Sequence, residues 1–523
     1  MPAVLTPTAE RTAPPRDLEV RPRQVRAWLE SLPLAQVADT ARKVIAHAAA
    51  LNRAKVDNDD RIQILESYRA VTTVLFDELD AVYSKATVPL GAKAREALTL
   101  ARDLASQVAV GYRVAMAERG GKLFGAKKQL PLLVLRAMDH YAMLLRAAYK
   151  SYTPVPEGLW REIHQLYLDA EREKIAAEIV DPDTKDAVVN VYVEALLLAL
   201  TDPYRLSPGE ADKVSAQIRS ARAPVTLGQS RPGTRSGGHF LVPCDTDKPP
   251  KPALSANDDT GGPNWRLLDC NPIVEKVRMR LTAIETGNVS ATMRSAASPD
   301  LVALLRKLVI LWGDPPKRAS RRNPSDGTVA ICVGLRAVSQ FVAMEPKDPA
   351  AEQAMLKRGI TMPLQRPEFG ELGEASVFEY DIVNQSDGGL KVRRTGPTPQ
   401  ALAVGEVVGI KQAHRPRWTI AVVRWITVYE EGGMEFGVQS LAPNARLVQV
   451  QPTIAGTTSQ PRPGLLLADE DDPDRYEVLL AQPNTFSELR EFEIDSDGSV
   501  SHVRARALRE KTARFDLFDV SPS

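Results

Sequence analysis

Five residues in the second half of the chain combine side-chain types and spacings that suit ligand binding. Arg318 and Arg322 lie four positions apart in a polar, proline-flanked segment. Asn384, Ser386 and Gly389 follow a stretch in which apolar and polar residues alternate, as they do in a β-strand. We expect the strand to break at this second group, which then presents polar side chains and bare backbone. Because glycine lets a backbone approach closely, the group suits a ligand dense in hydrogen-bonding groups.

Each group alone has a simpler interpretation. Asp387-Gly388, between two apolar runs, is typical of an ordinary hairpin turn. The basic run Lys317–Arg322 is typical of a solvated linker. The two groups carry more weight as a set, because an Arg-x-x-x-Arg pair precedes one strand-like run and an Asn-x-Ser-x-x-Gly pattern follows another.

Further strand-like runs around these groups indicate a small β domain. They cover residues 328–335, 378–382, 404–410, 418–429 and 434–439. The arrangement resembles the PilZ domain, a small antiparallel β-barrel that binds the bacterial second messenger cyclic di-GMP. Arg318 and Arg322 match the arginine motif of that family. Asn384, Ser386 and Gly389 match its Asp/Asn-x-Ser-x-x-Gly motif.

The resemblance covers about residues 316–450 and includes one departure from the family pattern. Val423–Trp425 and Gly437–Gln439 resemble the closing strands of the family. Residues 345–373, however, look inserted between the first two strands, with a short helix expected at 348–358. The insertion removes no motif residue, but it can cover or reshape the site.

The resemblance implies cyclic di-GMP as the ligand and gives each motif residue a role. A guanidinium can pair with guanine O6 and N7, stack on a purine or bind a phosphate, so Arg318 and Arg322 would clamp the dinucleotide. Asn384 has donors and an acceptor for a base edge, and Ser386 can donate to a phosphate oxygen. Gly389 would let the strand pass close to the ligand.

Length, composition and charge limit the remaining possibilities. A chain of 523 residues is too long for one core, and 44% apolar with 25% charged residues is typical of a globular protein. The net charge of +1 argues against a surface that coats nucleic acid or membrane. Cys244, Cys270 and Cys332 are widely spaced, which favours a reducing compartment and no zinc site. With no signal peptide and no membrane span expected, the chain is predicted to be cytoplasmic.

The fold class expected is multidomain α+β. An all-helical N-terminal domain precedes the PilZ-like antiparallel β-barrel, and a small β-rich C-terminal region follows it. In residue numbers, we expect a disordered N-terminus at 1–21, the helical domain at 22–205, a mixed linker region at 206–315, the barrel at 316–450 and the C-terminal region at 464–520. Within the mixed region, residues 239–243 and 265–269 are short strand candidates. In the fifth helix, Trp160, Ile163, Tyr167 and Ala170 form an apolar stripe that favours a core position.

Two classes of function are consistent with these patterns. The first is a cyclic di-GMP receptor that couples ligand binding to an unknown protein partner through its helical domain, in motility, pilus or biofilm control. The second is a constitutive interaction scaffold or chaperone-like adaptor whose barrel does not bind nucleotide. No catalytic motif is found, and His47, His140 and His164 lie on separate expected helices without metal-ligand partners, so we expect neither enzyme activity nor a metal or other cofactor.

Overall fold

The computed structural model divides into two compact units. One comprises Met1–Ala86 and Leu90–Lys317, and the other comprises Thr87–Pro89 and Arg318–Ser523. The residues that the structure describes are 10–119, 126–180, 186–221, 225–229, 237–253, 262–288, 298–314, 323–345, 376–396, 398, 400–413, 415, 417–429, 432–453, 460–468, 475–496 and 498–523.

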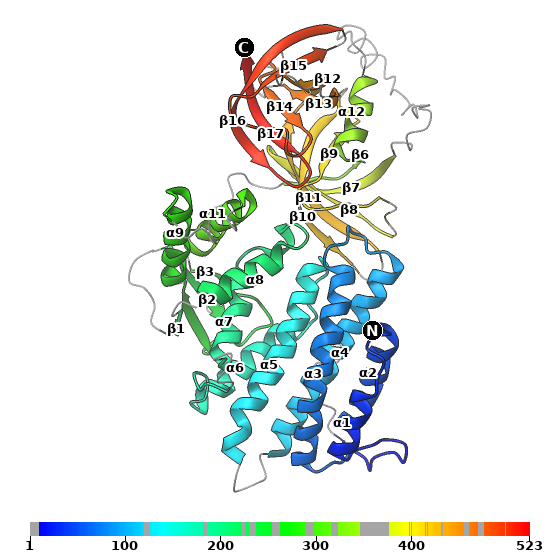
Figure 1. Ribbon diagram of the computed structural model, residues 1–523, viewed down its shortest axis with the longest axis vertical. Coiled ribbons are helices and arrows are strands. Elements are labelled where there is room, and N and C mark those ends of the chain that lie inside the picture. Colours follow the sequence, from blue (N-terminus) through cyan, green and yellow to red (C-terminus); the bar gives the residue numbers. More distant parts are fainter. Residues whose placement is uncertain are drawn as a thin grey trace. The chain divides into compact units, whose positions relative to one another are not determined.

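The first unit is built mainly from antiparallel helices. Their bounds are α1 (Pro22–Glu30), α2 (Val37–Arg53), α3 (Asn58–Tyr83), α4 (Ala92–Arg119), α5 (Ala126–Lys150), α6 (Leu159–Arg172), α7 (Val188–Ala199), the short 3-10 helix η1 (Pro203–Arg205) and α8 (Glu210–Ala221). The long helices α3, α4 and α5 lie side by side (Figure 1). Leu65, Leu104 and Leu144 are buried among them. Asp57 begins α3 by accepting hydrogen bonds from the backbone N–H groups of Asp59 and Asp60.

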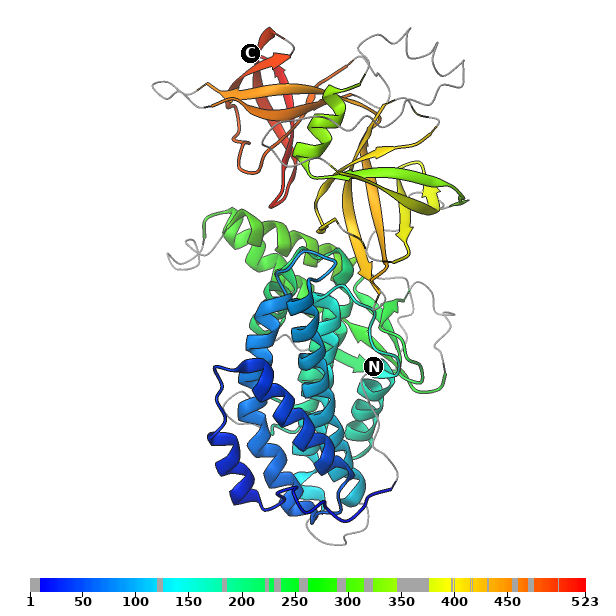
Figure 2. The same cartoon turned by 90° about the vertical axis from the view of Figure 1, so that its right-hand side faces the viewer.

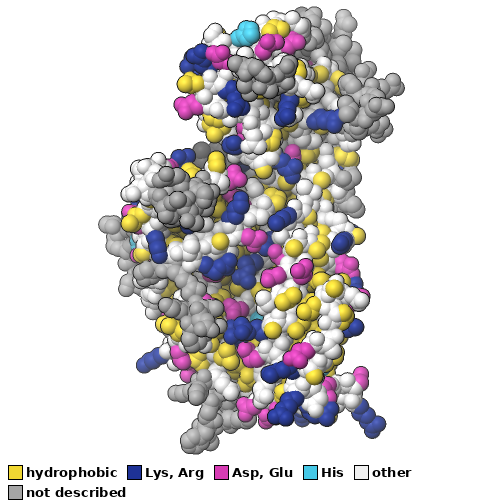
Figure 3. Space-filling model, in the orientation of Figure 1, with side chains coloured by type: hydrophobic (Ala, Val, Ile, Leu, Met, Phe, Trp, Pro, Cys, Tyr) yellow, Lys and Arg dark blue, Asp and Glu magenta, His cyan; other side chains and the backbone are white. Residues whose placement is uncertain are grey.

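The apolar stripe predicted for the fifth helix lies in the core of this unit. Trp160, Ile163, Tyr167 and Ala170 of α6 are all buried, so the prediction of a core stripe is confirmed. On the face shown in Figure 3, the helices carry lysine and arginine interspersed with aspartate and glutamate. This mixture of signs agrees with the net charge of +1.

A small sheet and a helical hairpin complete the first unit. The antiparallel sheet has the strand order β1-β4-β2-β3. Its strands are β1 (Thr226–Gly228), β2 (His239–Pro243), β3 (Lys251–Pro252) and β4 (Trp265–Asp269), and the helices that follow are α9 (Asn271–Glu285) and α11 (Pro299–Gly313). β2 and β4 lie where their sequence patterns predict short strands.

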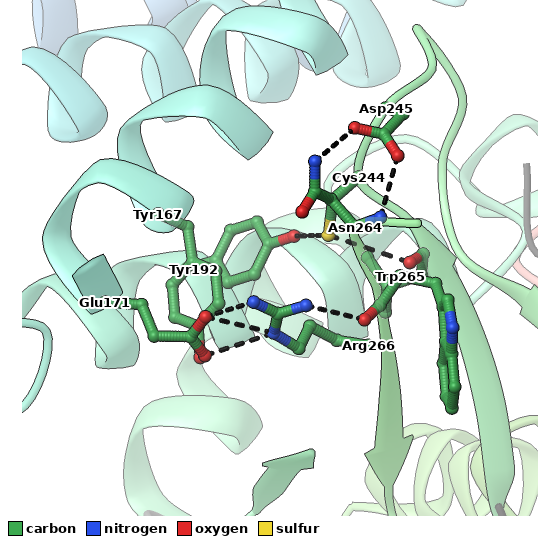
Figure 4. A network of polar contacts seen from close by, with 9 residues as sticks. Tyr167, Glu171, Tyr192, Cys244, Asp245, Asn264, Trp265 and Arg266 are labelled. Carbon is green, nitrogen blue, oxygen red and sulfur yellow. Dashed lines mark hydrogen bonds and ion pairs between the residues drawn. The ribbon is translucent and has the colours of Figure 1, made fainter. Parts of the chain in front are cut away.

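Polar contacts fix this sheet against α6 and α7 (Figure 4). Arg266 of β4 forms an ion pair with Glu171 of α6, and the Tyr167 hydroxyl donates to the same carboxylate at 3.2 Å. The Tyr192 hydroxyl of α7 lies 3.5 Å from the Cys244 thiol. Because the sheet and the helices share these polar contacts, the segment from β2 to β4 is an integral part of the helical unit.

The second unit begins with a six-stranded antiparallel barrel. The ring runs β7-β6-β9-β10-β11-β8 and closes through pairing of β7 with β8, while β5 pairs with the end of β7 in line with β6. The bounds are β5 (Asn323–Pro324), β6 (Thr328–Val333), α12 (Leu335–Ala343), β7 (Val377–Ser386), β8 (Gly389–Arg394), β9 (Val407–Lys411), β10 (Thr419–Val428) and β11 (Met434–Ala442). Tyr380, Val392 and Phe436 are buried inside the ring.

A second closed barrel follows, with the strand order β12-β13-β14-β17-β16-β15. Its strands are β12 (Ala445–Pro452), β13 (Arg462–Leu467), β14 (Val478–Ala481), β15 (Glu491–Ser496), β16 (Ser499–Lys511) and β17 (Asp516–Pro522). The predicted fold class is therefore confirmed, and the β-rich C-terminal region is a complete barrel. The sequence boundary at 450 falls inside β12, which pairs with β13 and β15.

The helix α12 packs between the two barrels (Figure 2). Val338 and Phe341 of this helix share one apolar cluster with Ile420 on the outer side of the first barrel and with Leu465 and Phe515 of the second. Buried apolar area of this kind stabilises an interface, so the two barrels form one body.

Candidate functional site

The Asn-x-Ser-x-x-Gly motif forms the end of a tight β-hairpin. We expected the strand to break at Asn384, but β7 continues through Ser386 and only Asp387-Gly388 form the turn. Ser386 pairs directly with Gly389, the first residue of β8, and its hydroxyl donates to the Gly389 carbonyl oxygen at 3.4 Å. The expectation that the strand breaks at Asn384 is thus wrong. The cause is that cross-strand pairing outweighs the weak intrinsic strand preference of these residues, because Asn384 pairs with Lys391 and Ser386 pairs with Gly389.

Strand register places Asn384 in a row of residues that crosses four strands. Asn384 pairs with Lys391 of β8, Lys391 pairs with Gly437 of β11, and Gly437 pairs with Trp425 of β10. Directly paired residues point to the same side of a sheet. The neighbouring row contains the buried Phe436 and faces the barrel interior, so the row that begins at Asn384 lies on the outer surface.

A second outer row runs beside the first and contains the other two motif residues. Ser386 pairs with Gly389, and Gly389 pairs with Gln439 of β11. A Cβ atom on Gly389 would overlap the carbonyl oxygen of Val438, so this position requires glycine to keep β8 on β11. The Gln439 side-chain oxygen accepts a hydrogen bond of 2.8 Å from Arg424 Nε.

The two arginines of the first motif lie outside the described residues. The chain emerges from that segment at Asn323, which pairs with Gln385, and Pro324 pairs with Asn384. Arg322 is the residue immediately before Asn323 in the sequence. The segment that carries Arg318 and Arg322 therefore joins the barrel through the strand next to Asn384.

A carboxylate organises the cations on the same outer surface. Glu435 forms ion pairs with Lys391 Nζ at 2.8 Å and with Arg393 Nη2 at 2.5 Å, and it accepts a hydrogen bond of 3.1 Å from the Tyr429 hydroxyl. Burial raises the pKa of the Glu435 carboxyl, but these donors together outweigh burial and lower its pKa below the usual value for glutamate. Glu435 therefore stays ionised at neutral pH and fixes the ammonium group of Lys391, which belongs to the first outer row.

Some residues of this surface were missed as site residues in the sequence. Arg424, Trp425 and Gln439 were assigned only to closing strands, and Lys391 was given no role. One signal for Lys391 is present in the sequence. Lys391 lies two residues after the motif glycine, and every second residue of a strand lies on the same face of the sheet. The positions of Arg424, Trp425 and Gln439 on the same surface as Asn384 depend on strand register, which the sequence pattern does not give.

Comparison with known protein families decides which fold family this is. Residues 23–231 match the model described as "Cyclic-di-GMP receptor FimW, N-terminal domain". Residues 239–347 and 345–446 match the model described as "Cyclic-di-GMP receptor FimW, middle PilZ domain". The chain contains a PilZ domain. The PilZ match ends at the second residue of β12, and it begins at β2, which is packed in the helical unit.

A curated relative matches over most of this PilZ protein. The chain is 25% identical over 479 residues to the cyclic-di-GMP receptor FimW of Pseudomonas aeruginosa, and the match covers 82% of this chain and 78% of the relative. No helix among the described residues is long and apolar enough to cross a membrane. Within the same part of the chain, no three histidine, cysteine, aspartate or glutamate side chains are grouped as metal ligands.

Proposed function

We propose that this PilZ protein is a bacterial cyclic di-GMP receptor and that the ligand binds on the outer surface of its first barrel. The observation that carries the proposal is the pairing of the two outer rows. Asn384, Ser386 and Gly389 share one surface, and β5, which pairs with β7 at Asn384, directly follows the arginine motif. The similarity to a curated cyclic-di-GMP receptor supports the same ligand.

The residues of this surface have complementary roles in the proposed complex. Asn384 binds a guanine edge and Ser386 donates to a phosphate oxygen. Gly389 keeps the backbone flat, so the ligand can lie against the sheet. Arg318 and Arg322 close over the ligand from the adjoining segment, where they bind guanine or phosphate by charge-assisted hydrogen bonds.

The proposal includes a signalling role, with no catalytic step. The helical unit would pass the binding signal to a protein partner, in control of motility, pili or biofilm formation. A cytoplasmic location is proposed because Cys244, Cys270 and Cys332 are free and buried, as suits a reducing compartment. Hydrogen exchange of residues 313–327 tests the coupling, since ligand binding is expected to slow it and Arg318→Ala is expected to reduce that effect.

Isothermal titration calorimetry with cyclic di-GMP tests the binding itself. We expect micromolar or tighter affinity, and a stoichiometry that distinguishes a single ligand from a stacked pair. Arg322→Ala and Asn384→Ala should each weaken binding, the former by about 1.5–3 kcal/mol because it removes hydrogen bonds to charged groups. Gln385→Ala is the matched control, because its side chain alternates to the other side of β7.

Absence of heat and of any thermal shift at high ligand concentration would overturn the receptor function. That result would favour the alternative of a constitutive scaffold or adaptor whose barrel does not bind nucleotide. Equal losses in Gln385→Ala and Asn384→Ala would also count against the proposed surface, since only Asn384 shares it with Ser386 and Gly389.

A further inference from the structure

A cavity opens at one end of the second barrel, where β12 and β14 end and β13 and β15 begin. Its volume is about 380 Å³, which falls within the range of about 300–1,000 Å³ that is common for small-molecule sites. Val450 and Ala481 line the cavity, are almost fully buried and belong to the apolar cluster inside the barrel. The cavity therefore has an apolar floor that is formed by the barrel interior.

Two arginines line the mouth of this cavity. Arg462 is the first residue of β13 and pairs with Val450, so its side chain lies on the interior side of the sheet. Arg490 lies two residues before Phe492, which is buried inside the barrel, and strand alternation places Arg490 on the same side. Because β12 pairs with both β13 and β15, the two arginines lie at the starts of the strands that flank β12.

The two arginines contact only uncharged oxygens of the described residues. Arg490 Nη1 donates to the Thr485 carbonyl oxygen at 2.8 Å, and Arg462 Nη1 lies 3.4 Å from Gln482 Oε1. In the part of the chain that the structure describes, neither guanidinium forms an ion pair with a carboxylate. Since a guanidinium has five N–H donors, most of them remain unused. The mouth therefore offers two positive charges and several donors to a ligand.

The wall that carries the two acceptors is held by its own contacts. The backbone N–H of Phe486 donates at 2.8 Å to the carboxylate of Asp516, which is fully buried. The Thr485 hydroxyl donates to the Gln482 carbonyl oxygen at 2.7 Å and closes the turn after β14. Asp516 anchors this wall and is not among the residues that line the cavity. A preformed wall reduces the conformational entropy that is lost on binding.

We propose that the mouth of the second barrel binds an organic anion, namely a carboxylate attached to a short apolar group. Arg462 and Arg490 would hold the carboxylate by charge-assisted hydrogen bonds, and the apolar group would pack on Val450 and Ala481. An apolar floor disfavours a ligand that is charged on all sides, such as inorganic phosphate, because the charge would lose water without gaining a partner there. Two sources present the proposed chemistry, the C-terminal residue of a polypeptide and a free carboxylic acid.

Calorimetric titrations of the full chain test this site. The probes are a short peptide that ends in leucine with a free carboxylate, the same peptide with a C-terminal amide, isocaproate, which has the leucine side chain without the amino group, and inorganic phosphate. We expect at least one of the two carboxylates to bind, and the amide and phosphate to give no heat at the same concentration. Tighter binding of the peptide assigns the polypeptide source, whereas equal or tighter binding of isocaproate assigns the free acid.

Arg462→Ala and Arg490→Ala should each weaken binding of that carboxylate about ten- to a hundredfold, since each removes hydrogen bonds between charged groups. Arg446→Ala is the matched control and should bind as wild type does. The Arg446 guanidinium lies 4.4 Å from the ring centroid of Tyr476, near the start of β12 and so at the other end of the barrel. Thermal melts show whether each variant is folded.

Three results would overturn this proposal. They are no binding of either carboxylate, equal binding of the amide or of phosphate, and unchanged binding in a folded variant that lacks both Arg462 and Arg490. None of them depends on cyclic di-GMP, whose proposed surface lies on the first barrel, so the receptor function is tested separately.

Discussion

Arg424 of the PilZ barrel and Glu510 of the C-terminal barrel form a two-point ion pair. Arg424 Nη1 lies 2.5 Å from Glu510 Oε1, and Nη2 lies 2.8 Å from Oε2. The same guanidinium donates through Nε to Gln439, which pairs with the motif glycine Gly389. One side chain of the second barrel therefore contacts the proposed ligand surface through a single arginine.

Neutralising this carboxylate is expected to strengthen ligand binding. Glu510→Gln removes a negative charge near the site of an anionic ligand and leaves more of the Arg424 charge available. Since both side chains are partly exposed, we expect a change of about 0.5–1 kcal/mol, which is about two- to fivefold in affinity. Calorimetric titration with cyclic di-GMP at low and high salt measures it, and the difference should shrink at high salt.

Glu491→Gln is the matched control for this prediction. Glu491, like Glu510, is a carboxylate of the second barrel that forms an ion pair with an arginine. Its partner is Arg504, so the pair links β15 and β16 within the second barrel. The control should leave affinity unchanged. A loss of affinity in Glu510→Gln would mean that the carboxylate aligns Arg424 for the ligand and does not compete with the ligand for its charge.

Gly389→Ala should destabilise the PilZ barrel. The added methyl group would overlap the Val438 carbonyl oxygen, so β8 would have to move away from β11. We expect a loss of about 2–4 kcal/mol in the free energy of unfolding, measured by urea denaturation. Gly388→Ala is the control, because a Cβ atom there meets nothing within 4 Å. Equal stability of the two variants would show that Gly389 is not required by packing.

Local features of the fold could be predicted from the sequence, whereas long-range pairing could not. The α6 stripe, the strands at 239–243 and 265–269 and the motif hairpin follow from local patterns, and the structure contains all of them. The second barrel could be predicted only as short strands, because its closure depends on the pairing of β12 with β15. The place of Trp425 on the motif surface could not be predicted for the same reason. Trp425 shares a row with Asn384 because of three successive strand pairings and a bulge in β10. No local sequence pattern encodes these pairings.

Acid should destabilise the helical unit through His164. Its Nε2 lies 2.9 Å from the Lys248 carbonyl oxygen, which can only accept, so Nε2 carries the proton and Nδ1 accepts from the Tyr192 hydroxyl at 2.8 Å. Burial lowers the pKa of His164 from 6.5 to about 4. Because the pKa of His164 is lower in the folded state than in the unfolded state, the unfolded state binds a proton first as the pH falls. The contribution of neutral His164 to the free energy of unfolding is therefore fully present above pH 6.5 and is lost as the pH falls towards 4.

The expected loss for this one group is about 2 kcal/mol between about pH 7 and pH 5. Urea denaturation at the two pH values measures it. His164→Gln should reduce this pH dependence, since an amide can still donate to Lys248 and accept from Tyr192. His502→Gln, which changes an exposed histidine of β16, is the control. An unchanged pH dependence in His164→Gln would show that other groups cause the acid sensitivity.

The last prediction concerns where the helical domain ends. Residues 22–205 should fold alone with a mainly helical circular dichroism spectrum, as their sequence pattern indicates. The structure also predicts that a longer fragment is more stable, because contacts join residues on the two sides of residue 205. The buried Trp312 donates from Nε1 to the Leu197 carbonyl oxygen at 3.0 Å, and Arg266 pairs with Glu171.

A fragment of residues 22–313 keeps these contacts and should be more stable than residues 22–205. Several buried hydrogen bonds and the Trp312 side chain together contribute about 3–5 kcal/mol, which corresponds to a melting temperature about 10 °C higher. Trp312→Ala in the longer fragment should lower its melting temperature part of the way to that of the shorter one. Equal melting temperatures for the two fragments would show that the β1–β4 sheet and the α9–α11 hairpin add nothing to the helical fold, and a strand-rich or unfolded spectrum for residues 22–205 would show that the helices cannot form their core without them.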